Sequence, residues 1–406
     1  MQNDGALERA RAILRDAPLI DGHNDLLFQL RDRVGYDLSR LDPVEPQPDL
    51  DTDVPRLRAG AVGGQFWSVF MPSDLPGDTA VTGTLEQIDA LHLLVDAHPD
   101  VFERARTADD VVRVAAAGRV ASMIGVEGGH SIGCSLGALR SLARLGAGYM
   151  TLTHFDNTPW ADSATDTPVH GGLSRFGEEV VREMNRLGVM VDLSHVSADT
   201  MRHAMRVSEV PPVFSHSSAR ALCDVTRNVP DDVLEDVGRA GGVVMVAFVP
   251  AFVAPEGRES MAAYLEELAS LRVEHQGDAD AITAGMKTFE ETHPEPTATV
   301  AQVADHVDHI RDVAGVDCIG VGGDFDGAGV MPKGLEDVSC YPNLFAELLD
   351  RGYTEEECAK IAGRNVLRLM RRTEETAARL RDERPPSVAT IETLDGGTEG
   401  PAKKGA

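Results

Sequence analysis

Eight short apolar segments, rich in β-branched and aromatic residues, recur along the chain and alternate with stretches of helical periodicity. They are residues 17–23, 63–70, 121–128, 149–155, 189–195, 212–217, 241–248 and 318–325. Continuous apolar strands between amphipathic helices indicate a parallel sheet that is covered by helices. Eight such units in one chain predict an α/β fold of the (β/α)8 TIM barrel type, with an open doubly wound sheet as the alternative.

The length of 406 residues permits two or three ordinary domains or one large α/β barrel with insertions, and the eight recurring units favour the single barrel. We expect residues 1–383 to form this domain, since the last helical segment ends near residue 383. The connections at 28–62 and 249–317 are long, and long loops in compact domains usually carry function. Residues 384–406 are rich in Pro and Gly and are expected to form a flexible tail.

Charge and composition exclude several classes of partner. The formal net charge of -28 argues against nucleic acid and anionic membranes, because both require a basic surface. The five cysteines form no CxxC pair, so a thiolate zinc cluster or a disulfide framework is not expected. The first twenty residues lack the features of a signal peptide, and no apolar run approaches membrane-spanning length. We expect a cytoplasmic protein, and a homodimer stays open.

Six of the eight apolar segments end in a histidine or a carboxylate. The residues at these ends are His23 with Asp25, Glu127, His154, His195, His216 and Asp324. In a (β/α)8 barrel the C-terminal strand ends meet at one mouth, where active sites lie. Each residue alone has an ordinary explanation, such as a half-buried histidine or an acid in the first turn of a helix. Their recurrence at the same end favours one shared site.

Histidines and carboxylates together suit zinc and other divalent transition metals. His23 and Asp25 are two residues apart, so on a strand they point to the same side and can bind one ion. His195 and His216 come from neighbouring strands and can hold a second ion. Glu127 can bridge two ions through its two oxygens. A carbamylated lysine is the other common bridge, but no lysine lies at a predicted strand end, so Glu127 is the best candidate. The pattern predicts a binuclear metal site.

Two arginines and a tryptophan follow strand ends in the predicted loops. Arg220 and Arg227 can bind a substrate carboxylate, or can pair with nearby acids such as Asp224. Trp160 can form an apolar wall of the site or pack in the core. Asp21 precedes His23 by two residues on the same strand face, and the sequence assigns it no role.

Seven motifs resemble those of the renal (membrane) dipeptidase family of the amidohydrolase superfamily. They are DGHND (21–25), EGGHSIG (127–133), LTHFDNTPWAD (152–162), VDLSHVS (191–197), FSHSSAR (214–220), TRNVPDD (226–232) and GGDFDG (322–327). They occur in the order found in the family. The resemblance implies a (β/α)8 barrel with two zinc ions at its mouth and hydrolysis of free dipeptides, including those with a D-residue at the C-terminal position.

The resemblance also implies roles for the metal ligands. His23 and Asp25 would bind one zinc ion, and His195 and His216 the other. Glu127 would bridge the two ions, together with a water or hydroxide that attacks the peptide bond.

Three further residues gain roles on the substrate side from the same resemblance. His154 would contact the carbonyl oxygen of the substrate, Arg227 would bind its terminal carboxylate, and Asp324 would transfer protons.

The chain departs from animal members of that family, which are secreted and lipid-anchored. Val249 stands about where those members have a tyrosine, so we expect a different side-chain selectivity. Two other functions stay open. One is another reaction of binuclear amidohydrolases, such as deacylation of N-acyl amino acids or hydrolysis of lactones. The other is a non-enzymatic binding protein on a barrel fold.

Overall fold

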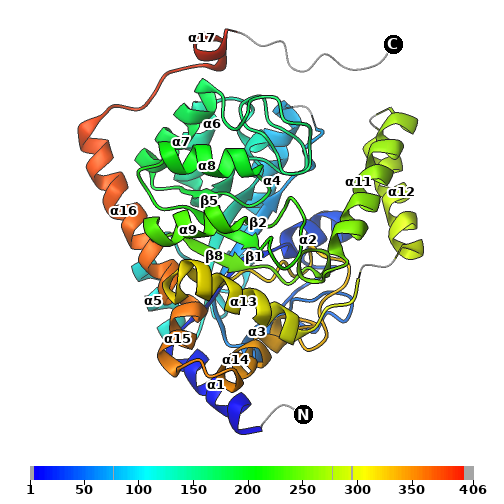
Figure 1. Ribbon diagram of the computed structural model, residues 1–406, viewed down its shortest axis with the longest axis vertical. Helices are drawn as coiled ribbons and strands as arrows, with labels where there is room; N and C mark the ends of the chain where they lie inside the picture. The colour runs from blue at the N-terminus through cyan, green and yellow to red at the C-terminus, as the bar shows by residue number, and fades with distance from the viewer. Residues whose placement is uncertain (1–3, 76, 277, 294–295, 397–406) are drawn as a thin grey trace.

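Each of the eight predicted segments contributes one strand to a closed parallel barrel (Figure 1). The structure is a computed structural model that describes residues 4–75, 77–276, 278–293 and 296–396. The barrel strands are β1 (Leu19–Asn24), β2 (Val62–Phe70), β4 (Val120–Glu127), β5 (Ala147–Thr151), β6 (Met190–Asp192), β7 (Val213–Ser217), β8 (Val243–Val246) and β9 (Ile319–Val321). Pairing of β2 with β4 closes the circle. The prediction of a (β/α)8 barrel is confirmed, and the open doubly wound sheet is excluded.

One further strand was not predicted from the sequence. β3 (Phe102–Arg104) pairs in parallel with β4 and stands outside the circle of eight. Its three residues are too short to show a periodic pattern, and only Phe102 among them is buried.

Helices surround the barrel, as Figure 1 shows. They are α1 (Asp4–Asp16), α2 (Leu26–Val34), α3 (Val54–Ala59), α4 (Gly77–Ala97), α5 (Ala108–Ala116), α6 (Leu136–Leu145), α7 (Arg175–Leu187), α8 (Ala198–Val207), α9 (Asp231–Ala240), α10 (Pro250–Val253), α11 (Gly257–Glu274), α12 (Ala279–Thr292), α13 (Val300–Ala314), α14 (Tyr341–Asp350), α15 (Glu355–Ala359), α16 (Asn365–Glu383) and α17 (Ile391–Asp395). Short 3-10 turns lie at η1 (Gly129–Ile132), η2 (Val316–Cys318) and η3 (Val338–Cys340), and a π-helical turn lies at η4 (Lys360–Arg364). Within the described ranges, none of the helices combines the length and the apolar character that a bilayer span requires.

Local sequence signals set the helix ends, and α7 illustrates how. The Ser174 side chain accepts a hydrogen bond from a backbone N–H of the first turn, and Gly188 ends the helix in a left-handed conformation. Between these caps, Phe176, Val180 and Met184 recur at intervals of four and are buried. Because α7 ends at Gly188, the chain can enter strand β6 of the barrel wall two residues later.

The long connection after β8 contains four helices, α10 to α13. α11 and α12 form a hairpin that stands off to one side of the barrel in Figure 1. A small apolar cluster of Leu271, Ile282 and Met286 joins these two helices to each other. This hairpin is therefore an insertion with its own packing.

Part of the predicted tail lies against the barrel domain. Asp395 of α17 accepts hydrogen bonds from the Ser174 hydroxyl at 2.7 Å and from the backbone nitrogens of Arg175 and Phe176. A carboxylate is favourable there because it meets the N-terminus of α7. Residues 397–406 lie outside the described residues, so a flexible tail beyond residue 383 stays a prediction.

Strands β1, β7 and β9 approach one another closely at the barrel mouth. A Cβ atom added at Gly22, in β1, or at Gly322, just after β9, would overlap the backbone carbonyl oxygen of Ser215 in β7. These two glycines let the three strand ends converge. The convergence brings the rings of His23 and His216 to a centroid distance of 3.8 Å.

We expect Gly322→Ala to destabilise the fold, because the added methyl group meets a backbone atom that can move only if β7 moves. The expected loss in the free energy of unfolding is about 2 kcal/mol, measured by urea denaturation. Gly137→Ala is the matched control, since a Cβ at this exposed position in α6 meets only ordinary contacts. Equal stability of the Gly322→Ala protein and the wild type would contradict this account of the mouth.

Candidate metal centre

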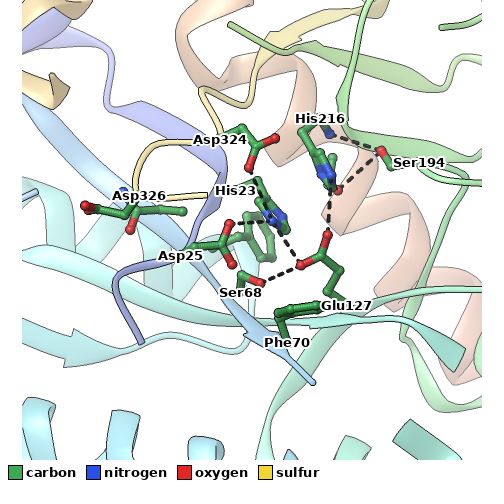
Figure 2. A network of polar contacts seen from close by, with 12 residues as sticks. His23, Asp25, Ser68, Phe70, Glu127, Ser194, His216, Asp324 and Asp326 are labelled. Carbon is green, nitrogen blue, oxygen red and sulfur yellow. Dashed lines mark hydrogen bonds and ion pairs between the residues drawn. The ribbon is translucent and has the colours of Figure 1, made fainter. Parts of the chain in front are cut away.

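All the residues predicted at the strand ends meet at the barrel mouth. Figure 2 shows His23, Asp25, Glu127, His216 and Asp324 turned toward a common centre. His154 and His195 join them, with their rings 4.3 Å apart between centroids. Six of these seven residues are buried, and the side chain of Asp324 is only 14% exposed.

His23 faces three carboxylates through its Nε2 atom. This atom lies 3.3 Å from Asp25 Oδ2, 3.4 Å from Glu127 Oε2 and 3.9 Å from Asp324 Oδ1. Burial by itself lowers the pKa of His23, but Tyr149, Glu127 and Asp25 outweigh it and hold the pKa well above the usual value. The pocket therefore favours a positive charge at Nε2, which a proton or a metal ion can supply.

Tyr149 determines which nitrogen of His23 faces the site. The Tyr149 hydroxyl donates to the Gly22 carbonyl oxygen at 2.9 Å. The hydroxyl lies 3.0 Å from His23 Nδ1, so it accepts the Nδ1–H. In a neutral His23 ring, Nε2 then carries the lone pair that a metal ion needs.

A pair of imidazoles, those of His195 and His216, lies on the other side of Glu127 from His23. His195 Nε2 is 2.9 Å from Glu127 Oε1 and 2.9 Å from His216 Nε2. Burial, together with nearby positive groups such as Arg227, holds the pKa of both histidines well below the usual value. Both rings are therefore neutral, which is the form that binds metals.

Ser215 orients His216 in the way that Tyr149 orients His23. The Ser215 hydroxyl donates to Asp192 Oδ2 at 2.6 Å and lies 2.8 Å from His216 Nδ1. It therefore accepts the Nδ1–H of His216, and the Nε2 lone pair points toward Glu127 and His195.

Glu127 lies between His23 and His216, with one carboxylate oxygen toward each (Figure 2). Its Oε2 faces His23 and accepts a hydrogen bond from the Ser68 hydroxyl at 3.0 Å. Its Oε1 faces His195, and also His216 at 3.5 Å and His154 at 3.6 Å. Burial alone would raise the pKa of Glu127, but His23, Ser68 and Arg227 together lower it below the usual value. A charged carboxylate with one oxygen toward each set of histidines is suited to bridging.

These donor atoms fit divalent metal ions. Three groups have ligand atoms within 4.8 Å of one another: His23 with Glu127 and His216, Glu127 with His154 and His195, and His23 with Asp25 and Asp324. The His23 Nε2 atom is buried and has no hydrogen-bond partner among the described residues. Lone pairs of imidazole and carboxylate that converge in this way are the ligands of zinc-type ions.

Arg227 lies beside this cluster, fully buried in the loop between β7 and α9. Its guanidinium donates to the Ser217 hydroxyl and to the His216 carbonyl, both at 3.3 Å, and sits over the Phe252 ring. No carboxylate of the described part of the chain forms an ion pair with it, and burial lowers its pKa to about 10. A buried, unpaired cation is costly unless an anion joins it.

The second candidate arginine has an ordinary structural partner. Arg220 pairs with Asp224 at 3.0 Å and is one-third exposed. Trp160 is fully buried and packs against Gly129. The structure therefore supports pairing with a nearby acid for Arg220 and packing in the core for Trp160, two explanations that the sequence left open.

Asp324 follows β9 and adopts a left-handed backbone conformation with φ of 62°. Burial raises the pKa of this carboxyl to about 8, with Asp25 and Glu127 adding to the effect and His23 opposing it. A bound cation would favour its charged form. A Cβ at Gly327 would collide with the carboxylates of both Asp25 and Asp324, so this glycine leaves room for them.

Sequence reasoning missed the residues that orient the ligands. Tyr149, Ser215, Asp192 and Ser68 are polar residues inside apolar strands. A polar residue inside an apolar strand is unusual and could have drawn attention to them. Its position in the sequence does not show which side chain it contacts. Asp21 belongs with them, since it accepts hydrogen bonds from the backbone nitrogens of His23 and Gly323.

Comparison with known proteins identifies the family to which the chain belongs. The sequence profile of the membrane dipeptidase family (peptidase family M19) matches residues 7–384. Dipeptidase 3 of Mus musculus is 40% identical over 389 residues, which are 94% of this chain and 69% of that protein.

Solved structures are similar over nearly the whole chain. A metallopeptidase from Rhodobacter sphaeroides, liganded with a phosphinate mimic of the dipeptide L-Ala-D-Ala, has a TM-score of 0.72 and 26% identity, covering 88% of this chain and 99% of that one. The probable dipeptidase PvdM from Pseudomonas aeruginosa has a TM-score of 0.79 and 24% identity, covering 92% and 100%, and shows the same fold.

The chain therefore belongs to the membrane dipeptidase family. It is a metal-dependent hydrolase of the metallodipeptidase class, and dipeptides are the substrates that the family implies. Membership of this enzyme family supports an enzyme over the alternative of a non-enzymatic binding protein.

We expect Tyr149→Phe to weaken metal binding, because the variant loses the hydroxyl that orients His23. The expected loss of affinity is about tenfold to a hundredfold, measured by competition with a chelator. Tyr353→Phe is the matched control, since the Tyr353 hydroxyl bonds Asp308 at 2.7 Å, away from the mouth. Equal metal affinity in the two variants would contradict the role given to Tyr149.

Proposed function

We propose that this member of the family is a zinc-dependent dipeptidase that cleaves free L-Xaa-L-Xaa and L-Xaa-D-Xaa dipeptides. The observation that carries the proposal is the buried guanidinium of Arg227, which has no carboxylate partner among the described residues and lies beside a cluster of metal ligands. Such an arrangement suits a substrate whose carboxylate lies a short distance from the bond to be cleaved.

Two zinc ions fit the ligand sets. His23 and Asp25 would hold one ion, His195 and His216 the other, and Glu127 would contact both. The support is the placement of one Glu127 oxygen toward each set, and the neutral state of His195 and His216. When bound, zinc ions supply Lewis acidity, which polarises a carbonyl group and lowers the pKa of a bound water to about 7.

Arg227 would bind the C-terminal carboxylate of the dipeptide. Among the described residues, the hydrogen-bond acceptors of its guanidinium are two neutral groups, the Ser217 hydroxyl and the His216 carbonyl, both at the long distance of 3.3 Å. An incoming carboxylate offers a stronger, charge-assisted pair. Because the His216 backbone is one of these contacts, the arginine lies next to the ligand cluster.

His154 would donate a hydrogen bond to the carbonyl oxygen of the scissile bond. Burial holds the pKa of His154 well below the usual value, so the ring is neutral and keeps one N–H. The rings of Phe70 and Phe155 lie 4.5 Å and 4.4 Å from it and restrict its orientation. A donor fixed in this way stabilises the negative charge that develops on the oxygen.

Asp324 would act as the proton carrier. Its carboxylate would take a proton from the attacking water as the oxygen–carbon bond forms. It would return the proton to the amine as the carbon–nitrogen bond breaks. Asp324 is partly exposed and lies beside His23 and Asp25, so both the attacking water and the leaving amine could reach its carboxylate.

Substrate length follows from two fixed contacts. His154 would hold the scissile carbonyl, and Arg227 would hold a carboxylate one residue away. A longer peptide would place a neutral amide opposite Arg227 and would lose the charge-assisted pair. We therefore expect dipeptides to be preferred over tripeptides.

The stereochemical part of the proposal draws on a relative. The Rhodobacter sphaeroides metallopeptidase is liganded with a mimic of L-Ala-D-Ala, which supports acceptance of a D-residue at the C-terminal position. The deciding experiment is a screen of the zinc-loaded protein against L,L and L,D dipeptide libraries. N-acyl amino acids and lactones serve as the alternative substrates. Turnover of the alternatives without turnover of dipeptides would overturn the proposal.

We expect Arg227→Met to raise KM for free dipeptides by about tenfold to a hundredfold, because a charge-assisted pair is lost. C-terminally amidated dipeptides should be affected much less. Arg220→Met is the matched control, since Arg220 lies in the same loop and pairs with Asp224. Equal changes for free and amidated substrates would count against a carboxylate site at Arg227.

We expect Asp324→Asn to lower kcat by about a hundredfold or more while the metal content stays unchanged, because an amide cannot carry the proton. Steady-state kinetics and metal analysis on the same preparation check this. Substantial turnover in the variant would remove Asp324 from proton transfer.

A further inference from the structure

The loop that carries His154 is held from outside the barrel by α11. Asp156 lies two residues beyond His154, and Arg272 of α11 donates to both of its carboxylate oxygens. The Nη1–Oδ1 distance is 2.6 Å and the Nη2–Oδ2 distance is 2.9 Å. A bidentate pair of this kind fixes orientation as well as distance.

Arg272 and Asp156 are both largely buried, so each supplies the charge that compensates the other. Arg272 and Asp156 are only 31% and 27% exposed, and Arg272 Nε is buried with no hydrogen-bond partner in the described part of the chain. Burial alone would raise the pKa of Asp156, but Arg272 and the Ser73 hydroxyl lower it, so the carboxylate is charged. Ser73 lies in the loop between β2 and α4, which makes Asp156 a junction of three segments.

A second contact joins α11 to the same loop one residue earlier. The ring of Phe155 lies 4.4 Å from that of His154 and 6.0 Å from that of Tyr264 in α11. Two consecutive loop residues, Phe155 and Asp156, therefore touch α11. The side chain of His154 is in direct contact with the first of them.

The α11–α12 hairpin is not part of the barrel wall. Its apolar residues pack mainly within the hairpin, and Figure 1 shows the two helices side by side, standing off from the strands. The barrel does not need Arg272 to close, since its strands pair without α11. The Arg272–Asp156 pair thus links an inserted unit to a loop at the mouth.

We infer that Arg272 is a positioning residue: through Asp156 it fixes the loop of His154 at the geometry that the substrate carbonyl requires. The inference rests on the role proposed above for His154. Small displacements of a group that contacts the transition state are costly, and about 1 Å of misplacement can lower the rate about a hundredfold.

Arg272→Met tests the inference in the zinc-loaded protein with a dipeptide substrate. We expect kcat to fall about tenfold or more with little change in KM, because Arg227 still binds the carboxylate. Arg272→Lys should recover part of kcat, since it keeps the charge but not the fork. Arg258→Met is the matched control, because this other arginine of α11 is 71% exposed and pairs with Asp224.

A double-mutant cycle separates positioning from general damage. Asp156→Asn should reproduce the loss in kcat, and the double variant should lose no more than either single variant. Metal content should stay at the wild-type value in all of them, and each variant should remain folded at the assay temperature even where loss of the ion pair lowers the thermal midpoint. Wild-type kcat in Arg272→Met, or additive losses in the double variant, would overturn the inference while leaving the dipeptidase proposal intact. A wild-type protein without dipeptidase activity would instead overturn the proposed function itself.

Discussion

Negative charge buried at the barrel mouth is the constraint on which the site depends. Asp25, Glu127 and Asp324 all lie within 4 Å of His23 Nε2, and their side chains are largely removed from water. Arg227 is buried nearby but pairs with none of them. A buried charge without compensation costs several kcal/mol, so cations bound between these groups would stabilise the native mouth. Folding, protonation of His23 and metal binding are therefore linked.

The barrel supplies this arrangement through close approach of strands that are not all neighbours. β1, β7 and β9 converge where Gly22 and Gly322 leave no side chain in the way. Tyr149 and Ser215 then turn His23 and His216 toward the centre. Of the residues proposed to bind metal, His23, Glu127 and His216 lie on strands, and Asp25 and His195 follow strand ends. The outer, substrate-facing part is built on loops, and one of these loops is attached to the α11 insertion.

Sequence patterns were sufficient for the strands and for the residues at their ends. Once the segments are assigned to a (β/α)8 barrel, their polar C-terminal ends place His195 and His216 at the mouth, because the strand ends meet there. The strand β3 could not be predicted from the sequence, because three residues are too few to show a period. The contacts of Tyr149 with His23 and of Arg272 with Asp156 could not be predicted for another reason. Each joins residues more than one hundred positions apart, and no local pattern marks them as partners.

Glu127 is proposed to lie between two metal ions at the mouth. Anomalous diffraction at the zinc edge, from crystals of the zinc-loaded protein, would locate these ions. We expect two peaks, one beside His23 and Asp25 and one beside His195 and His216, with Glu127 contacting both. A single peak with Glu127 on one side of it, or peaks away from these residues, would rule out a bridging Glu127.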